Sequence, residues 1–327
     1  MKLIIFLLSL INFNYCLAVS NDSPNLDYNK PKTISWEAWL KNLKKDLEKE
    51  RFKKSTIQIL DNLTFNSKVI EYDRKQPEFK LNFSEYLKRN INSKKKKELK
   101  ENYSKYNKLL NKISLEFDVD SKVLTSLWGI ETAFGKHLGK MDIIRSLASL
   151  AYDGRRKKFF LKELRFALKI LDDGHINKKH FKGSWAGAFG QTQFMPSTFH
   201  KYAIDFDKND KINLFDRSDA LASGANYLKN AGWNNKLLWG EKININLTEN
   251  LKKMSKNKKF QKQKFWKNHG VFLKNQYNKD VLFRLIIPDL EENHFFLVTR
   301  NFDVILDWNR SNYFALTVFL LSNEIQD

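Results

Sequence analysis

One stretch constrains the fold more than any other: residues 121–135 read S-K-V-L-T-S-L-W-G-I-E-T-A-F-G. Apolar residues recur in it at helical spacing, namely Val123, Leu127, Ile130 and Phe134. Asp120 or Ser121 can cap such a helix at its start, and Gly135 can end it. The pattern therefore predicts a helix that is buried along one face.

Glu131 is a carboxylate on this apolar face. At 100° per residue it falls between Leu127 and Phe134. Burial disfavours the charged form of a carboxylate and would raise its pKa, which suits a general acid that works near neutral pH. A second interpretation is that Glu131 pairs with a buried cation such as Arg145 or Arg155, because structural ion pairs also bury carboxylates.

The start of the chain has the pattern of a secretory leader. Lys2 precedes the apolar run L-I-I-F-L-L-S-L-I, and cleavage can follow Ala18. We therefore expect residues 1–18 to be a signal peptide, the mature protein to be periplasmic, and no transmembrane span to remain. Lipid attachment at Cys16 is less expected, because Phe13-Asn14-Tyr15 lacks the small residues that normally precede a lipidated cysteine. A mature chain without cysteine needs no disulfide in an oxidising compartment.

The charge balance points to anionic partners. The formal net charge is +21, and a strongly basic protein attracts nucleic acid, anionic membranes or acidic wall polymers. Export and the lack of a nucleic-acid fold signature argue against nucleic acid. Lysines are bunched at Lys94–Lys97 and along residues 252–267, and a solvated surface also accounts for most of them.

The order of the elements predicts an α+β protein. Residues 19–33 form a polar lead-in. Helices are expected within 36–47, 57–63, 86–91, 99–117, 142–152, 159–171, 196–202, 220–231 and 312–321. Because Pro77 ends any helix before it, residues 69–79 are expected to be extended or a turn. Strands are expected at 281–287 and 295–299, with a further one at 301–308, and residues 239–278 are expected to be irregular.

Residues 205–216 have the spacing of a calcium loop. Oxygen-bearing side chains stand at positions 1, 3, 5, 9 and 12, namely Asp205, Asp207, Asn209, Asn213 and Asp216. Asp210 replaces the expected glycine, although aspartate tolerates positive φ better than most residues. Asp216 is shorter than the usual bidentate glutamate. Weak calcium binding and a polar turn without metal are both compatible with this loop.

Six motifs in order resemble those of the membrane-bound lytic murein transglycosylase B family, lysozyme-like enzymes that cut peptidoglycan. They are V-I-E-Y-D-R-K-Q-P-E-F at 69–79, W-G-I-E-T-A-F-G at 128–135, L-A-Y-D-G-R-R at 150–156, G-S-W-A-G-A-F-G-Q-T-Q-F-M-P-S at 183–197, L-A-S-G-A-N-Y-L at 221–228, and D-W-N-R-S-N-Y-F-A at 307–315. The resemblance covers residues 34–325.

The resemblance implies a role for Glu131, the glutamate of the family's W-G-x-E-T motif, as the catalytic acid/base. In the family this acid protonates the glycosidic oxygen between N-acetylmuramic acid and N-acetylglucosamine, and then accepts the proton of the muramic C6 hydroxyl, which closes a 1,6-anhydro ring. Ordinary glycosidases need two carboxylates. Here the nucleophile belongs to the substrate, so the chemistry requires one carboxylate and no cofactor.

The resemblance also implies a set of substrate-cleft residues: Ser184, Gln193, Asn309 and Tyr313. The alternative is that the serine and the asparagine cap helices and the tyrosine packs in the core. Calcium-bearing members of the family make a structural calcium at residues 205–216 plausible.

The expected architecture is a mainly helical lysozyme-like fold with a small β-sheet inserted late. We expect a helical part at 34–118, a lysozyme-like core at 119–240 completed by 305–325, and a β-containing part at 241–304. The leading function is an exported lytic transglycosylase that acts as a monomer on peptidoglycan. The alternatives are a hydrolytic muramidase, in which water captures the sugar cation, and a wall-binding protein without turnover.

Overall fold

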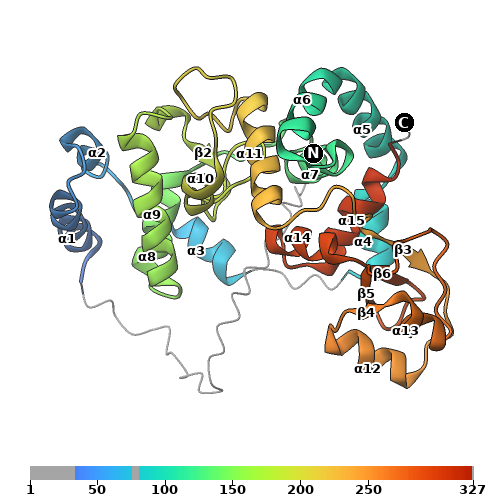
Figure 1. The fold of residues 1–327 in the computed structure, drawn as a ribbon. Coiled ribbons are helices and arrows are strands. Elements are labelled where there is room, and N and C mark those ends of the chain that lie inside the picture. The colour runs from blue at the N-terminus through green and yellow to red at the C-terminus, as the bar shows by residue number, and fades with distance from the viewer. Residues whose placement is uncertain (1–33, 76–80, 326–327) are drawn as a thin grey trace. The chain divides into compact units, whose positions relative to one another are not determined.

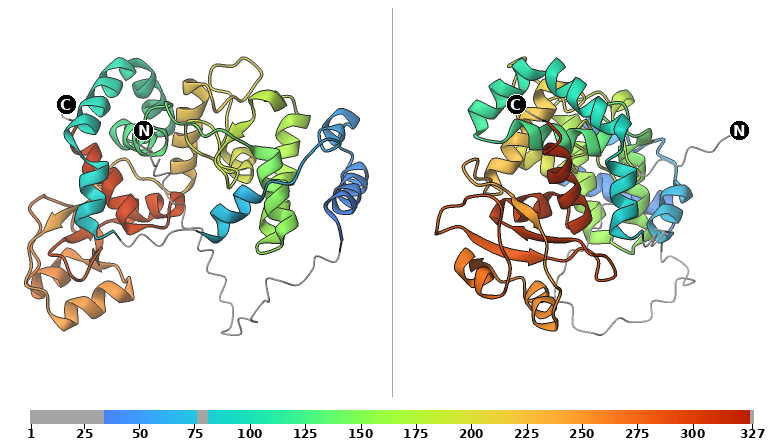
Figure 2. Two further views of the ribbon diagram at one scale, coloured as in Figure 1. Left: turned by 180° about the vertical axis from the view of Figure 1, so that it is seen from behind. Right: turned by 90° about the vertical axis from the view of Figure 1, so that its right-hand side faces the viewer.

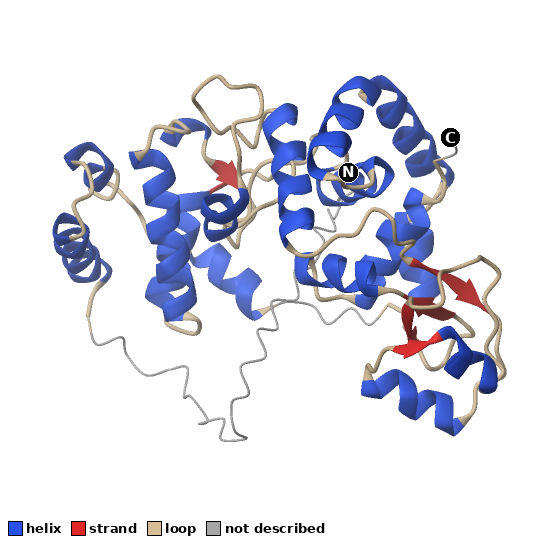
Figure 3. Cartoon of the chain, viewed as in Figure 1, coloured by secondary structure: helices blue, strands red, loops and turns tan. Residues whose placement is uncertain are grey.

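The computed structural model describes residues 34–75 and 81–325, and it is mainly helical with two small antiparallel sheets (Figures 1 and 3). The α+β prediction is therefore confirmed. The expected leader and lead-in lie outside the described residues. Within the described residues, no helix is long and apolar enough to cross a membrane.

The helices are α1 (Trp36–Lys49), α2 (Lys54–Gln58), α3 (Ser67–Arg74), α4 (Phe83–Asn90), α5 (Ser93–Lys105), α6 (Asn107–Phe117), α7 (Ser121–Thr132), α8 (Ile143–Asp153), α9 (Lys157–Asp172), the 3-10 helix η1 (Lys178–His180), α10 (Pro196–Tyr202), α11 (Arg217–Asn230), α12 (Glu249–Asn257), α13 (Gln263–Asn268), α14 (Arg300–Trp308) and α15 (Asn312–Ser322). The strands are β1 (Met141–Asp142), β2 (Lys182–Gly183), β3 (Gly240–Ile243), β4 (Gln261–Lys262), β5 (Leu282–Ile286) and β6 (Phe295–Val298).

The described residues divide into two compact units, each with its own internal contacts. Unit 1 comprises residues 81–134 and 221–325, and unit 2 comprises residues 34–75 and 135–220. One boundary follows α7 directly, and the other falls inside α11. Each unit is described by itself below.

Unit 1 contains a helical core and a four-stranded sheet. Helix α7 packs against α5, α6 and α15. Residues 314–319 of α15 are all buried, as expected of a helix that is surrounded by protein. The sheet has the order β3-β6-β5-β4, with Gly240 and Arg284 both opposite Val298.

Helices α12 and α13 cover one face of this sheet (Figure 1). Leu251 of α12 and Trp266 of α13 are buried in the same apolar cluster as Phe283 and Leu285 of β5. The indole Nε1 of Trp266 donates to the carbonyl oxygen of Phe283 at 3.0 Å, so the polar atom of the largest side chain in this cluster is satisfied. The two helices therefore form an outer layer over the sheet.

Unit 2 is built on the pair α8 and α9, against which α3 and α10 pack. The side chain of Asp172, at the end of α9, accepts hydrogen bonds from the backbone nitrogen of Lys53 at 2.9 Å and from Thr56 Oγ1 at 2.7 Å. These bonds fix α2 on the end of α9. The strands β1 and β2 pair antiparallel, with Met141 opposite Gly183.

Two of the expected extended segments are helices. Residues 67–74 form α3, in which the side chain of Asn66 accepts from the backbone nitrogen of Lys68, and the helix ends before Pro77. Residues 300–308 form α14, because Phe302 and Ile305 recur at helical spacing and are both fully buried. Both predictions of extended structure were wrong.

The expectation that residues 239–278 are irregular was also wrong. They contain β3, α12, β4 and α13. Thr248 caps α12 by accepting from the backbone nitrogen of Leu251, and only one residue of the helix is buried. Polar residues at most of the remaining positions hide this short apolar contact from a periodicity analysis. The expected helix at 99–117 is divided into α5 and α6 near Tyr106.

Candidate active site

Helix α7 ends at Thr132 and not at Gly135, because the next two residues adopt left-handed backbone conformations, with φ of 49° at Ala133 and 62° at Phe134. The chain turns back, and the ring of Phe134 lies on Gly129, where an added Cβ would be 2.8 Å from Phe134 Cζ. The same ring meets Trp128 edge-to-face with centroids 5.2 Å apart. Gly129 therefore permits the turn that places Glu131 in the last turn of α7.

Glu131 is half-buried, and its carboxylate is bound by Trp308, the last residue of α14. The indole Nε1 of Trp308 donates to Glu131 Oε1 at 2.9 Å. Because an indole N–H can only donate, Oε1 is the acceptor in this hydrogen bond. The C-terminal end of a helix disfavours a negative charge. This position therefore suits a carboxylic acid that can give up its proton.

Three tyrosines surround this pair in unit 1. Burial and the charge of Glu131 raise the pKa of Tyr86, on α4, to about 12, so its phenol stays neutral at physiological pH. Tyr227, on α11, meets the ring of Trp308 edge-to-face with centroids 5.0 Å apart. Tyr313, on α15, meets the ring of Tyr86 with centroids 5.6 Å apart. Aromatic side chains thus lie next to Glu131 and Trp308, and such rings can contact the faces of sugar rings.

The hydroxyl of Tyr313 is directed to the connection between β5 and β6. It donates to Asp289 Oδ2 at 3.3 Å, and burial followed by the charge of Asp289 raises the pKa of Tyr313 to about 12. In the same connection, Glu292 Oε2 accepts from the backbone nitrogen of Ser84 at 2.9 Å, and His294 Nε2 lies 3.0 Å from Ser84 Oγ. The β5–β6 connection, residues 287–294, therefore binds both α4 and α15.

Asn309 lies directly after α14 and is buried. Its Oδ1 accepts from the backbone nitrogen of Ser311 at 3.1 Å, which fixes the turn between α14 and α15. This contact is of the helix-end kind that the alternative interpretation expected. The amide Nδ2 of the same side chain remains a donor that this contact does not use.

Ser184 and Gln193 lie in unit 2, within the glycine-rich loop that follows β2. Ser184 Oγ accepts from the backbone nitrogen of Ala188 at 2.9 Å, and its hydroxyl proton can still be donated. Gln193 has a φ of 49°, and its Nε2 donates to the carbonyl oxygen of Gly190 at 2.9 Å. Among the residues that the structure describes, none donates to Gln193 Oε1. Both side chains thus keep one polar group for a ligand.

The two arginines considered as partners of Glu131 have partners in unit 2. Arg145 donates to the carbonyl oxygens of Thr64, at 2.9 Å, and Phe65, at 3.1 Å. Arg155, together with the neighbouring Arg156, binds Asp73, whose side chain is buried. The motifs at 69–79 and 150–156 therefore meet, although residues 76–80 of the first motif lie outside the described residues.

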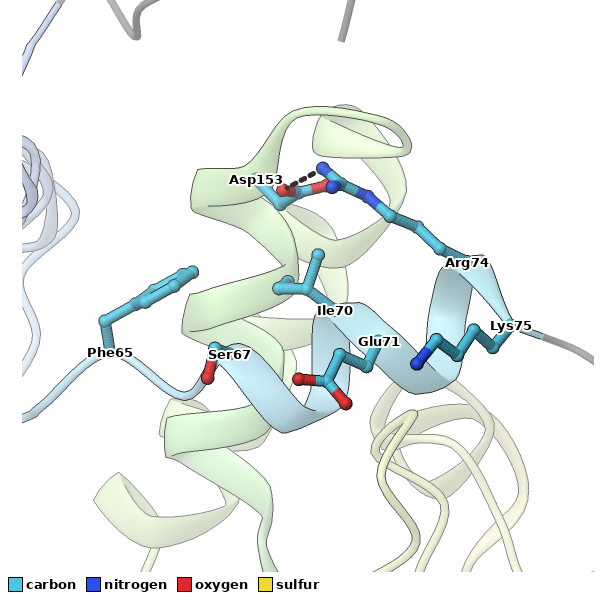
Figure 4. Close-up of a pocket in the computed structure, with 7 residues that line it drawn as sticks. All are labelled: Phe65, Ser67, Ile70, Glu71, Arg74, Lys75 and Asp153. Carbon is cyan, nitrogen blue, oxygen red and sulfur yellow. Dashed lines mark hydrogen bonds and ion pairs between the residues drawn. The ribbon is translucent and has the colours of Figure 1, made fainter. Parts of the chain in front are cut away.

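A cavity of about 500 Å³ lies beside this junction in unit 2 (Figure 4). Its polar rim includes Glu71 of α3 and Lys75, which directly follows that helix, and the ion pair between Arg74 and Asp153 at 2.8 Å crosses one side. The cavity is lined by Phe65, Ser67, Ile70, Glu71, Arg74, Lys75 and Asp153.

The calcium-like loop gathers carboxylates in unit 2. Oxygen atoms of Asp205, Asp207 and Asp219 lie within 4.8 Å of one another. Asp219 is fully buried, and burial raises its pKa, followed by the charge of Asp207. Asp210 adopts the positive φ, 65°, that a glycine would supply. Hard oxygen donors of this kind suit a calcium ion.

The other expected ligands make contacts within the loop. Asp216 Oδ1 accepts from the backbone nitrogen of Ser218 at 2.6 Å. Asn209 Oδ1 accepts from Lys211 at 3.0 Å, and Asn213 Oδ1 accepts from Phe215 at 3.0 Å. Asp219, which the twelve-residue pattern does not include, lies one helical turn after Asp216. The presence of an aspartate one helical turn after Asp216 is the sequence signal that could have identified Asp219.

Trp308, Tyr227 and Tyr86 were not among the predicted site residues. Trp308 and Tyr227 stand inside two of the recognised motifs, D-W-N-R-S-N-Y-F-A and L-A-S-G-A-N-Y-L, so motif membership could have identified them. Tyr86 stands in none of the six motifs. Trp308 is 177 residues from Glu131 in the chain, and only the fold brings the two together.

The chain is similar to known proteins in both sequence and structure. The model of the family described as transglycosylase SLT domain matches residues 35–323. The membrane-bound lytic murein transglycosylase B of Escherichia coli is 38% identical over 132 residues, which cover 40% of this chain and 37% of that protein. The aligned part thus spans well under half of the length of that relative.

Two crystal structures resemble the fold over 88% of this chain. SltB3 from Pseudomonas aeruginosa, in complex with NAG-NAM-pentapeptide, has a TM-score of 0.84 and 32% identity, with 79% of its chain covered. The Escherichia coli lytic transglycosylase Slt35, in complex with calcium, has a TM-score of 0.75 and 25% identity, with 91% of its chain covered.

Proposed function

The chain belongs to the transglycosylase SLT domain family, and we propose that it is a peptidoglycan lytic transglycosylase with Glu131 as its acid and base. The observation that carries this proposal is the half-buried Glu131, whose Oε1 is bound by Trp308 at 2.9 Å among aromatic side chains. The substrate class is supported by the relative from Pseudomonas aeruginosa, whose crystal structure holds NAG-NAM-pentapeptide.

The reaction needs one carboxyl group to act twice. Glu131 first gives its proton to the glycosidic oxygen, and the bond from C1 of N-acetylmuramic acid to that oxygen breaks. The C6 hydroxyl oxygen of the same sugar then bonds to C1, and its proton passes to the Glu131 carboxylate. The acid is restored, a 1,6-anhydro end is formed, and no water is consumed.

Two carboxylates near the recognised motifs, Asp142 and Asp153, have partners of their own. Asp142 caps α8 by accepting from the backbone nitrogen of Arg145, and it also binds Lys178. Asp153 pairs with Arg74. These partners support a mechanism in which the substrate supplies the nucleophile.

The proposed cleft residues act through the groups that their own contacts leave unused. We assign Ser184 the donation of its hydroxyl proton and Gln193 the acceptance of a hydrogen bond at Oε1. Asn309 Nδ2 can donate to a sugar hydroxyl or an N-acetyl carbonyl. The ring of Tyr313 contributes an apolar contact, and its hydroxyl is held by Asp289.

Replacing Glu131 with glutamine tests the proposal. Glutamine keeps the acceptor for Trp308 but cannot supply the proton, so turnover should fall by about 10² to 10⁴. The measurement is mass spectrometry of muropeptides released from purified peptidoglycan by the wild type and Glu131→Gln. Products lighter by one water than reducing muropeptides, and absent with the variant, are expected. Reducing products would indicate a hydrolytic muramidase, and release undiminished in the variant would refute the role of Glu131.

We also propose that the loop of residues 205–219 holds a structural calcium ion through Asp205, Asp207 and Asp219. The Escherichia coli Slt35 structure contains calcium, and the three carboxylates here offer oxygen donors within 4.8 Å of one another. No step of the reaction uses this ion. Its role would be to neutralise the buried Asp219 and to fix the loop.

Calcium should therefore stabilise the wild-type protein. Saturating calcium is expected to raise the unfolding midpoint by several degrees, because binding at about 100 times Kd contributes about 2.7 kcal/mol. Asp219→Asn should lose most of this gain, whereas Asp216→Asn should keep it. Differential scanning fluorimetry with calcium and with a chelator measures the effect, and equal gains in both variants would exclude Asp219 as a ligand.

The leader pattern and the wall substrate together support a periplasmic location, and we propose that the mature protein acts there as a monomer. Size-exclusion chromatography with light scattering on the chain from Val19 onward tests the monomer. N-terminal sequencing of the exported protein tests cleavage after Ala18.

A further inference from the structure

The outer layer of the sheet in unit 1 carries a dense group of lysines. Eight lie within residues 252–267, on α12, the turn that follows it, β4 and α13; we call this set the lysine face: Lys252, Lys253, Lys256, Lys258, Lys259, Lys262, Lys264 and Lys267. All but Lys252 are exposed. Only two have salt bridges among the described residues, Lys252 with Glu249 at 2.7 Å and Lys262 with Asp280 at 3.3 Å.

The apolar side of α12 is already used by the protein. Leu251 is 3% exposed, and Met254 packs against the same cluster under the sheet. Helices α12 and α13 lie on one side of the sheet (Figures 1 and 2). The exposed lysines therefore lie on the surface of a folded layer. Because the apolar side of α12 is packed in the core, this helix cannot bury that side in a membrane.

An apolar ring accompanies these cations. Phe272 is 62% exposed, although the preceding Val271 is buried in the cluster with Trp266. The backbone nitrogen of Val271 donates to the carbonyl oxygen of Trp266 at 3.0 Å, which fixes the start of this loop on the end of α13. Phe272 thus projects from the layer that carries the lysine face.

We propose that the lysine face, with Phe272, docks the mature protein on an anionic lipid bilayer. Groups of four to eight cations on a folded surface are attracted by the potential of anionic headgroups. An exposed aromatic ring beside them can enter the boundary between headgroups and acyl chains. Because the apolar side of α12 stays in the core, attachment should depend on charge, reverse with salt and prefer anionic lipid.

This docking does not require turnover, so its failure and the failure of the proposed function are distinguishable. Binding is measured with Glu131→Gln, by co-sedimentation with vesicles of phosphatidylglycerol and phosphatidylcholine in equal parts, and with vesicles of phosphatidylcholine alone. The protein begins at Val19, which excludes any contribution of Cys16. Binding to the mixed vesicles, weakened by salt and absent with phosphatidylcholine alone, is expected.

A matched pair of variants distinguishes an effect of the lysine face on binding from an effect of the net charge of the protein. The test variant replaces four exposed lysines of the face by glutamine: Lys253, Lys256, Lys259 and Lys264. The control replaces four exposed lysines of α5 and α6: Lys94, Lys97, Lys100 and Lys108. The test variant should lose at least about tenfold in vesicle partitioning and the control less than about twofold. Circular dichroism confirms that both are folded.

The contribution of the Phe272 ring is tested in the same vesicle assay. Phe272→Ser should lower partitioning by about threefold or more, and the control Leu115→Ser, at a residue that is 85% exposed on α6, should leave it unchanged. Equal losses in the two lysine variants, equal binding to both kinds of vesicle, or no vesicle binding would overturn the proposal. Loss of binding to purified peptidoglycan in the lysine-face variant, with vesicle binding unchanged, would assign the face to the wall polymer instead.

Discussion

At the scale of single residues, the behaviour of the acid depends on one indole. Trp308 donates a hydrogen bond to Oε1 of Glu131, so this carboxyl oxygen is held as an acceptor. The placement of Glu131 on an apolar helix could be predicted from the spacing of its neighbours. The contact between Glu131 and Trp308 could not be predicted, because the two residues are 177 positions apart and no local pattern links them.

Trp308→Phe should reduce turnover more than it reduces stability. The variant keeps an aromatic ring beside Tyr227 but removes the donor, and a hydrogen bond to a charged group contributes about 1.5–3 kcal/mol. We expect kcat to fall by roughly 10- to 150-fold and the unfolding midpoint to change little. Initial rates of muropeptide release measure this; an unchanged rate would mean that the indole does not orient the acid. The matched control is Trp233→Phe, in unit 1 and outside the aromatic group of Glu131.

At the scale of elements, the small sheet contributes to the site through one connection. Residues 287–294 bind α15 through Asp289 and α4 through Glu292 and His294. Helices α4 and α15 carry Tyr86 and Tyr313, whose rings are in contact. The late-inserted sheet therefore helps to hold two aromatic side chains near Glu131.

Asp289→Ala should lower kcat/KM by roughly 2- to 10-fold, because one ordinary hydrogen bond contributes about 0.5–1.5 kcal/mol. In a Tyr313→Phe background the same change should have little further effect, since its partner hydroxyl is already gone. The control is Asp280→Ala, because Asp280 lies in the same part of the chain and its salt bridge with Lys262 is at the surface. Additive losses in the double variant would show that Asp289 acts by another route.

Helices could be predicted from the sequence where a capping residue and an apolar period agree. They were mispredicted where tertiary contacts determine the local structure. Helix α7 has both signals, yet its end differs from the prediction because Phe134 packs on Gly129. Helix α12 has one buried residue, too few for a visible period. Helix α14 resembled a strand because a short apolar run does not distinguish the two.

At the scale of the whole molecule, two histidines make stability depend on pH. Burial lowers the pKa of His175 in unit 2 and of His294 in unit 1. Below about pH 6.5 the unfolded chain binds protons at these positions before the folded protein does. Stability should therefore be complete above that pH and should fall as the pH decreases below it.

The unfolding midpoint measured between about pH 5 and 8 tests this dependence. His175→Asn and His294→Gln keep a neutral polar group at the positions that face Ile212 and Ser84, so the double variant should lose less stability on acidification than the wild type. His180→Gln, at an exposed position, is the control. A wild-type midpoint that does not fall below pH 6.5, or an identical slope in the double variant, would contradict the assignment.

The distance in sequence between Glu131 and Trp308 has a consequence for biosynthesis. A growing or partly exported chain contains Glu131 long before it contains Trp308, Asn309 and Tyr313. A fragment that stops before α14 has the acid without the indole that orients it. The pair of Glu131 and Trp308 can therefore form only after the last helices are made, and an incomplete chain should lack most of the proposed activity.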